Sequence, residues 1–168
     1  MATHGNGFRI LGAADANWRL GRAWLALCLA IGVHVADEAA TGFLAVYNPT
    51  AEAIRAKLPW LPLPVFSFET WIAGLIMEII VLLALSAFVI RGARWMRPVA
   101  YALALIMVPN ALVHTLGTVL GRTVESVQFP RPMPGFYSSP LLLAASIYLL
   151  LQLRFSGSTG VEPRLQSP

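Results

Sequence analysis

Apolar residues along this chain run in four long blocks, separated by short polar or proline-rich segments. A helix needs about 20 mostly apolar residues to cross the hydrocarbon core of a membrane, and its backbone hydrogen bonds then lie within the segment. The blocks predict four such helices, over residues 23–47, 70–90, 99–121 and 136–153. The expected fold is therefore all-α, a four-helix transmembrane bundle.

The composition agrees with this pattern. Hydrophobic residues make up 57% of the 168 positions, charged residues only 12%, and the mean hydropathy is +0.68, values that lie outside the usual range of soluble domains. The ends differ from the rest. Residues 1–17 are small, polar and glycine-rich, and residues 156–168 are again polar, so we predict two tails around a membrane domain at 18–155. The lipid bilayer is thus the first expected partner.

The basic residues indicate the orientation of the bundle. Arginines gather before the first apolar block, between the second and third, and after the fourth, whereas the alternate loops carry few. Because positively charged loops tend to stay in the cytoplasm, we expect both ends of the chain there, in a bacterial inner membrane. The net charge of +4 is split among separate segments, so nucleic-acid binding is not expected.

Polar side chains interrupt three of the four apolar blocks. Counted at about 1.5 Å of rise per helical residue, they fall at nearly one depth, in the outer half of the membrane. An acidic residue at the centre of a spanning helix costs on the order of 2.5–3.5 kcal/mol, and hydrogen-bonding partners inside the bundle reduce that cost. We therefore expect the three helices to turn these side chains toward one another. The set is His34, Asp37, Glu38, Thr41, Glu78, Asn110, His114 and Thr115.

Imidazole and carboxylate groups are the usual protein ligands of Zn and of non-haem Fe or Mn. Two histidines and two glutamates from three helices match that preference, as related ligand sets do in di-iron carboxylate bundles. A metal site is one prediction from this set, and no nucleotide cofactor is expected. The predicted ligands are His34, Glu38, Glu78 and His114.

The same residues also support chemistry without a metal. A carboxyl group in apolar surroundings favours its protonated form, so a glutamic acid could donate a proton to a lipid-soluble substrate while a histidine removes one. Asp37 joins the four predicted ligands as a candidate catalytic residue in either version. Contact with the substrate, a hydrophobic small molecule, is expected from Asn110, Thr41 and Thr115.

Two other classes of protein fit the pattern. A proton-coupled transporter or small-molecule binder would use the polar groups as a proton relay, and a structural membrane subunit would use them to fix helix register. A transporter more often shows paired repeats and broken helices, whereas only Pro109 interrupts a block near the site. The sequence does not decide the oligomeric state.

The two loops expected on the outer side are rich in proline and aromatic residues, at 58–70 and 127–140. Proline prevents a continuous helix, and aromatic side chains favour the lipid headgroup region, so these loops are expected to cap the bundle or to anchor it at the membrane surface. In the third block Gly117 and Gly121, four residues apart, predict close packing between helices.

The segment His34-Val-Ala-Asp37-Glu38 resembles the motif of the HXXEE-motif family of integral membrane proteins, with aspartate in place of the first glutamate. The likeness extends to the small multi-span size and to the later Asn and His in a downstream apolar helix. It implies that the three motif residues belong to a site, and it names no reaction. Small sterol-isomerase membrane proteins of the emopamil-binding kind offer a weaker analogy for the acid–base version. The predicted function is a small membrane enzyme, isomerase- or cyclase-like, acting on a terpenoid, sterol-like or fatty compound.

Overall fold

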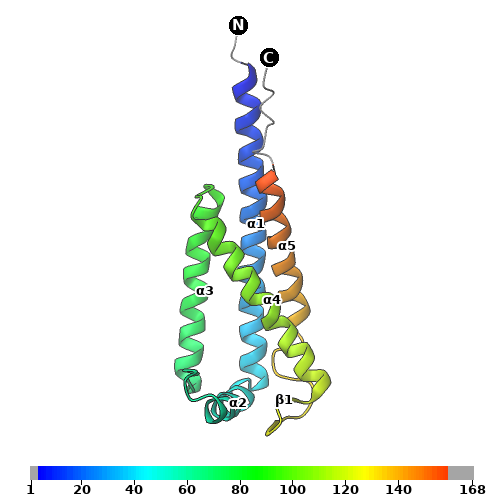
Figure 1. Cartoon of the computed structure of the whole chain (residues 1–168). Coiled ribbons are helices and arrows are strands. Elements are labelled where there is room, and N and C mark those ends of the chain that lie inside the picture. Colours follow the sequence, from blue (N-terminus) through cyan, green and yellow to red (C-terminus); the bar gives the residue numbers. More distant parts are fainter. Residues whose placement is uncertain (1–3, 159–168) are drawn as a thin grey trace.

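The computed structural model describes residues 4–158, which form five helices and one small hairpin (Figure 1). The helices are α1 (His4–Thr41), α2 (Leu44–Lys57), α3 (Phe68–Ile90), α4 (Met96–Leu120) and α5 (Ser139–Ser158). Two antiparallel strands, β1 (Arg122–Val124) and β2 (Val127–Gln128), lie between α4 and α5. The prediction of an all-α architecture is therefore confirmed over this part of the chain, apart from the hairpin, which the apolar pattern did not indicate.

Three of the helices are long and apolar enough to cross a membrane. They are the Asp15–Thr41 part of α1, the whole of α3 and the whole of α4, which continues through Pro109. The apolar part of α5, Ser139–Phe155, is shorter. The structure thus supports three of the four predicted spans by length and composition.

The first predicted span, residues 23–47, differs from the helix that forms. α1 begins at His4, within the predicted tail 1–17, and it ends at Thr41. Gly42 follows with φ of +78°, a conformation that side chains other than glycine rarely adopt. The N–H of Phe43 then donates to the Glu38 carbonyl (3.0 Å), a bond that closes the end of a helix. α2 then starts in a new direction (Figure 1). The sequence pattern did not predict this turn, because apolar residues continue across it.

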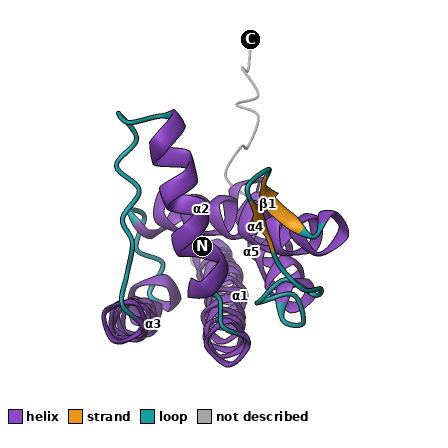
Figure 2. Cartoon of the chain, turned by 90° about the horizontal axis from the view of Figure 1, so that it is seen from below, coloured by secondary structure: helices purple, strands orange, loops and turns teal. Residues whose placement is uncertain are grey.

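α1 is the central helix of the bundle. It packs against α3 on one side and α5 on the other, while α4 packs mainly on α5 (Figures 1 and 2). Large apolar side chains fill these contacts, and Trp24, Leu27, Leu142 and Leu149 are fully buried. The Trp24 indole N–H also donates to the carbonyl of Leu82 (2.9 Å), which ties α1 to α3. In water, burial of apolar side chains supplies most of the stability of a helical domain. In a membrane, close packing between the helices takes over that role.

The two ends of the bundle are formed by different kinds of segment. The start of α1, the turn between α3 and α4, and the end of α5 lie at one end, while α2, the hairpin and the segment before α5 lie at the other (Figure 1). The arginine-rich segments therefore share an end, where Arg97 donates to the carbonyl of Leu153 (2.9 Å). The predicted orientation, with all arginine-rich segments on the cytoplasmic side, requires these segments to share one end of the bundle.

Gly117 and Gly121 do not bring two helices together, contrary to the prediction. Gly117 is buried, and a Cβ at this position would overlap the sulfur of Met133, which belongs to the segment before α5. Gly121 ends α4 with φ of +69°, its N–H donating to the Gly117 carbonyl (2.7 Å). Both glycines therefore let the chain after α4 fold back over that helix.

Candidate metal centre

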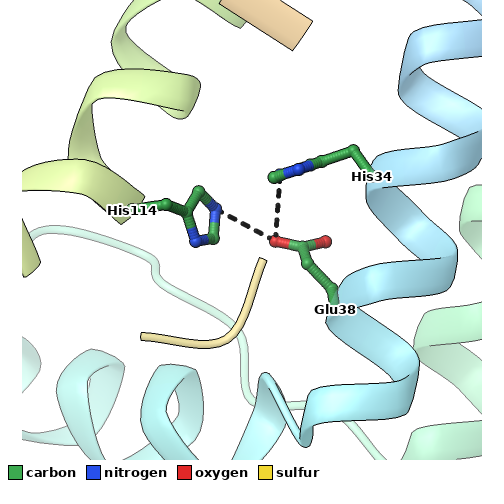
Figure 3. A group of neighbouring side chains, drawn as sticks. All are labelled: His34, Glu38 and His114. Carbon is green, nitrogen blue, oxygen red and sulfur yellow. Dashed lines mark ion pairs between the residues drawn. The ribbon is translucent and has the colours of Figure 1, made fainter. Parts of the chain in front are cut away.

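Three ionisable side chains converge between α1 and α4 (Figure 3). His34 and Glu38 come from α1, and their spacing of four residues puts them on one face. His114 comes from α4. Glu38 Oε1 lies 3.5 Å from His34 Nε2 and 3.2 Å from His114 Nε2. One ligand atom from each residue lies within 4.8 Å of the other two, so a single ion could contact all three.

This His-Glu-His group is closed off from its surroundings. The exposed fractions of His34, Glu38 and His114 are 3%, 6% and 1%. The two imidazoles meet edge to face, with ring centroids 4.7 Å apart and planes at 81°. Phe43, after the end of α1, packs against the His114 ring at 5.8 Å. A buried carboxylate is stable only with such partners, because an isolated charge of this kind is costly outside water.

His114 is held in one tautomer by a backbone carbonyl. Its Nδ1 lies 2.5 Å from the carbonyl oxygen of Pro134. A carbonyl only accepts hydrogen bonds, so Nδ1 carries a proton. In the neutral ring the lone pair is then on Nε2, the nitrogen that faces Glu38.

Ser138 has the same effect on His34. The Ser138 Oγ lies 2.7 Å from an Asp37 carboxylate oxygen, 3.2 Å from the Gly135 carbonyl and 2.8 Å from His34 Nδ1. The first two partners only accept, so the single hydroxyl hydrogen goes to one of them, and His34 Nδ1–H donates to the hydroxyl. The lone pair of neutral His34 is consequently also on Nε2.

Two imidazole lone pairs and a carboxylate therefore point into one small volume. With both histidines neutral, these three groups are all acceptors, so a metal ion or a proton is needed among them. A metal ion would satisfy all three at once, and an acceptor behind each Nδ1–H is the arrangement that orients histidine ligands at metal sites. A single proton on His114 would satisfy Glu38 instead, leaving His34 Nε2 to the Asn110 amide nitrogen, 3.4 Å away.

The segment between β2 and α5, residues 129–138, covers this group and is called the capping loop. Its Gly135 has φ of +81°, and a Cβ there would lie 2.8 Å from two atoms of the His114 ring and 3.0 Å from Glu38 Cγ. Its N–H donates to Thr41 Oγ1 (3.2 Å). Of the two roles predicted for the second proline-rich loop, capping and anchoring, the structure shows the cap at these residues. Only glycine allows the backbone to approach the site so closely.

The remaining predicted residues of α1 and α4 lie around the group in different ways. Asp37 lies beside it, and its carboxylate accepts from both the N–H (2.9 Å) and the hydroxyl (2.7 Å) of Ser138. Thr41 supports the capping loop. Asn110 contacts His34. Thr115 is exposed, and its hydroxyl bonds to a carbonyl one turn earlier in its own helix (3.3 Å), so it does not reach the group.

Glu78, the fourth predicted metal ligand, is not part of the group. It is exposed on α3 and forms no hydrogen bond or ion pair with any residue that the structure describes. The set of ligands that the structure brings together therefore has three members and not four. The outward neighbours of Glu78 on α3, Met77 and Ile80, are 60% and 54% exposed, which leaves this helix with an apolar outer surface.

Two contacts show that the depth predicted for Glu78 is nevertheless consistent with the fold. Trp24 of α1 bonds to Leu82 of α3, and Phe43, just beyond α1, stacks on Trp71 of α3 with centroids 5.8 Å apart. Glu78 lies between the two α3 partners, as the His-Glu-His group lies between the two α1 partners. The helices therefore carry their acids at a comparable level, and they differ in the direction that each side chain takes.

Sequence reasoning missed the residues that orient the two histidines. Ser138 and the carbonyl of Pro134 come from the capping loop, far from α1 and α4 in the sequence. The prolines of that loop indicated a rigid cap, but no spacing connected it with His34 or His114. Gly135 offered the only local signal, as a glycine between a proline and an aromatic residue.

The fold and the site thus define an α-helical protein with three helices suited to a membrane and a buried His-Glu-His group that could hold a metal ion. Comparison of the chain with family models, curated proteins and solved structures finds no match. The resemblance to the HXXEE-motif family stays a prediction. Of its motif residues, His34 and Glu38 belong to the group, and Asp37 lies directly beside it.

Proposed function

We propose that the protein is an integral membrane enzyme that holds a metal ion between His34, Glu38 and His114 and acts on a lipid-soluble substrate. The observation that carries the proposal is the convergence of two Nε2 lone pairs and one carboxylate in a buried volume, with each Nδ1–H held by a separate acceptor. Three protein ligands leave a coordination position for water or substrate, which distinguishes catalytic from structural metal sites.

The composition of the ligand set narrows the choice of metal ion. Two histidines and one carboxylate bind zinc in hydrolytic enzymes and non-haem iron in oxygenases, so Zn, Fe and Mn are the ions to test. When bound, such an ion supplies a Lewis acid at the centre of the bundle. The protein supplies the orientation of the ligands, through Ser138 and Pro134, and the exclusion of bulk water, through Gly135 of the capping loop.

The proposed setting is a four-span bundle in a bacterial inner membrane, with α5 as the fourth span. Its apolar part, Ser139–Phe155, is at the short end of the 17–25 residues that typically cross a bilayer. α5 packs along both α1 and α4, which supports the same depth for all three. The shared end of the arginine-rich segments supports cytoplasmic termini.

The position of Glu78 supports the proposal that the substrate reaches the site through the lipid. On α3 it lies four residues before Leu82 and seven after Trp71, and both of these side chains are buried. The three residues share one stripe of the helix, so Glu78 borders the packed face of α3, at the level of the metal centre. A membrane-embedded acid normally marks a functional contact. We assign Glu78 to the polar group of a terpenoid, sterol-like or fatty substrate.

An acid–base mechanism without a metal is the second candidate, and one contact favours it. The Asn110 amide can donate to His34 Nε2 (3.4 Å), so a single proton between His114 and Glu38 would complete the network. Asp37, Ser138 and His34 then form a hydrogen-bonded chain from the edge of the site to its centre, along which a proton could move.

Elemental analysis of the detergent-purified full chain tests the metal version. We expect about one Zn, Fe or Mn per chain in the wild type and a loss of most of it in His34→Ala and His114→Ala. Asn17→Ala serves as the control and should keep the metal, because Asn17 lies on α1 beside Gly92, at the end of the bundle away from the site. Metal below about 0.2 per chain after reconstitution with each ion would exclude this version.

Thermal unfolding separates the remaining alternatives. If no metal binds and the two histidine variants only lower the melting temperature, while neither alters ligand binding or proton flux in proteoliposomes, the polar group is structural. Substrate-dependent proton flux would instead identify a transporter.

A further inference from the structure

A second polar site lies where α4 ends and the hairpin begins. An open pocket of about 400 Å³ is present there, and it shares no lining residue with the His-Glu-His group. The wall combines the last turn of α4, the two strands and the start of the capping loop. The lining residues are Leu120, Gly121, Arg122, Gln128, Phe129 and Arg131.

Two positive charges in this pocket lack counterions. Arg122 and Arg131 are exposed, and neither guanidinium group forms a hydrogen bond or ion pair with any residue that the structure describes. Glu125, the acid of the same hairpin, is not paired with either of them. The C-terminus of a helix carries about half a negative charge, and the Arg131 guanidinium lies against Gly121 at that end of α4. Two full positive charges outweigh this partial charge, so the pocket attracts anions.

An apolar stripe leads along α4 to the mouth of the pocket. Leu112, Leu116, Val119 and Leu120 follow one another at helical spacing, and their exposed fractions are 43%, 57%, 65% and 59%. Leu120 belongs to both the stripe and the pocket wall. A ligand that fits both features has an anionic group joined to a long apolar chain, which is the structure of a membrane phospholipid.

We propose that the pocket binds the phosphate of an anionic membrane lipid, with the acyl chains along the α4 stripe. Guanidinium groups bind phosphate oxygens through paired, charge-assisted hydrogen bonds, which the ammonium group of lysine cannot form. Arg122 and Arg131 are therefore suited to a phosphate ligand. The pocket is next to the end of a membrane-suited helix, the level at which headgroups lie. This inference does not depend on the metal or on the enzymatic activity.

Retention of lipid by the full chain in native mass spectrometry tests the proposal. The wild type should retain phosphatidylglycerol in preference to phosphatidylcholine, and Arg122→Gln/Arg131→Gln should lower this retention by about tenfold or more. The matched control is Arg55→Gln/Lys57→Gln, which removes two positive charges from α2 at the same end of the bundle. Equal loss in the control would overturn the proposal, because general electrostatic attraction would then suffice.

Two further measurements cover the alternatives. Leu116→Ala/Val119→Ala should weaken retention of the lipid without changing the binding of inorganic phosphate. If inorganic phosphate competes fully and the stripe variant has no effect, the site takes free phosphate and the lipid assignment is wrong. If the double arginine variant does not fold, Arg131→Lys keeps the charge, and unchanged preference for phosphatidylglycerol in that variant would contradict the paired geometry.

Discussion

Glu38 and Glu78 are both acids at a comparable level of apolar helices, yet the structure surrounds them very differently. Glu38 is buried between two imidazoles, under a glycine of the capping loop. Glu78 is exposed beside an apolar surface, and no residue that the structure describes forms a hydrogen bond or ion pair with it. The difference shows that depth alone does not make a site. A carboxylate becomes part of a candidate metal centre only where neighbouring elements supply oriented partners, and here α4 and the capping loop supply them to α1 alone.

Glu38→Gln should give the largest effect on this comparison. The amide removes the anionic ligand but can donate to one imidazole Nε2, so the fold should survive while the metal is lost. Metal content is expected to fall from about one per chain to less than about a tenth of that, and the metal-dependent rise in melting temperature should disappear. Unchanged metal content in this variant would mean that the ion binds elsewhere.

Gly135→Ala should have the second-largest effect, because it combines backbone strain with a clash at the His114 ring. Strain at positive φ costs on the order of 1–3 kcal/mol. Gly42→Ala is the control, since Gly42 has a similar φ of +78° but nothing lies within 4 Å of its Cβ position. Denaturant unfolding should show a loss in both variants, and metal affinity should fall in Gly135→Ala only. Equal metal affinity in the two variants would show that the capping loop does not shape the site.

Ser138→Ala should have a smaller effect, which reaches the metal through the orientation of His34. The variant removes the acceptor of Nδ1–H, and loss of such an outer contact typically lowers metal affinity about 10–100-fold. Ser146→Ala removes another buried serine, one that bonds only within α5 (2.7 Å), and should leave the affinity unchanged. Titration with a competing chelator measures both. If the two serine variants behave alike, the contact with His34 has no role in binding.

Glu78→Gln should have the smallest effect on the metal centre. Metal content and metal-dependent stability should stay within experimental error of the wild type, because Glu78 contacts none of the ligands. Its effect is expected in the affinity for a lipid-soluble substrate or analogue. A loss of metal comparable to that of Glu38→Gln would show that α3 turns toward the site, and it would restore the four-ligand prediction.

The sequence predicted the helices and the level of the polar groups because both follow from spacing along one chain. The pair His34 and Glu38 follows from a spacing of four residues, and His114 follows from depth. The direction of Glu78 could not be predicted in this way. Residues all round α3 are apolar, so no polar face marks which side packs on α1.

Other features depend on contacts between distant segments. Apolar residues continue through Gly42, so the end of α1 and the start of α2 carried no hydropathy signal. The tautomers of the two histidines depend on Ser138 and Pro134, which reach the site only when the capping loop folds over it. The catalytic roles, the fourth span and the family stay predictions.

X-ray absorption at the edge of the bound metal tests the central claim most directly. In the purified full chain the spectrum should show two imidazole nitrogens and carboxylate or water oxygens at about 2.0–2.2 Å, with no sulfur neighbour, and the whole metal signal should fall with the metal content in His114→Ala. A shell of water oxygens alone, or a sulfur neighbour at about 2.3 Å, would contradict the assignment of the metal to His34, Glu38 and His114.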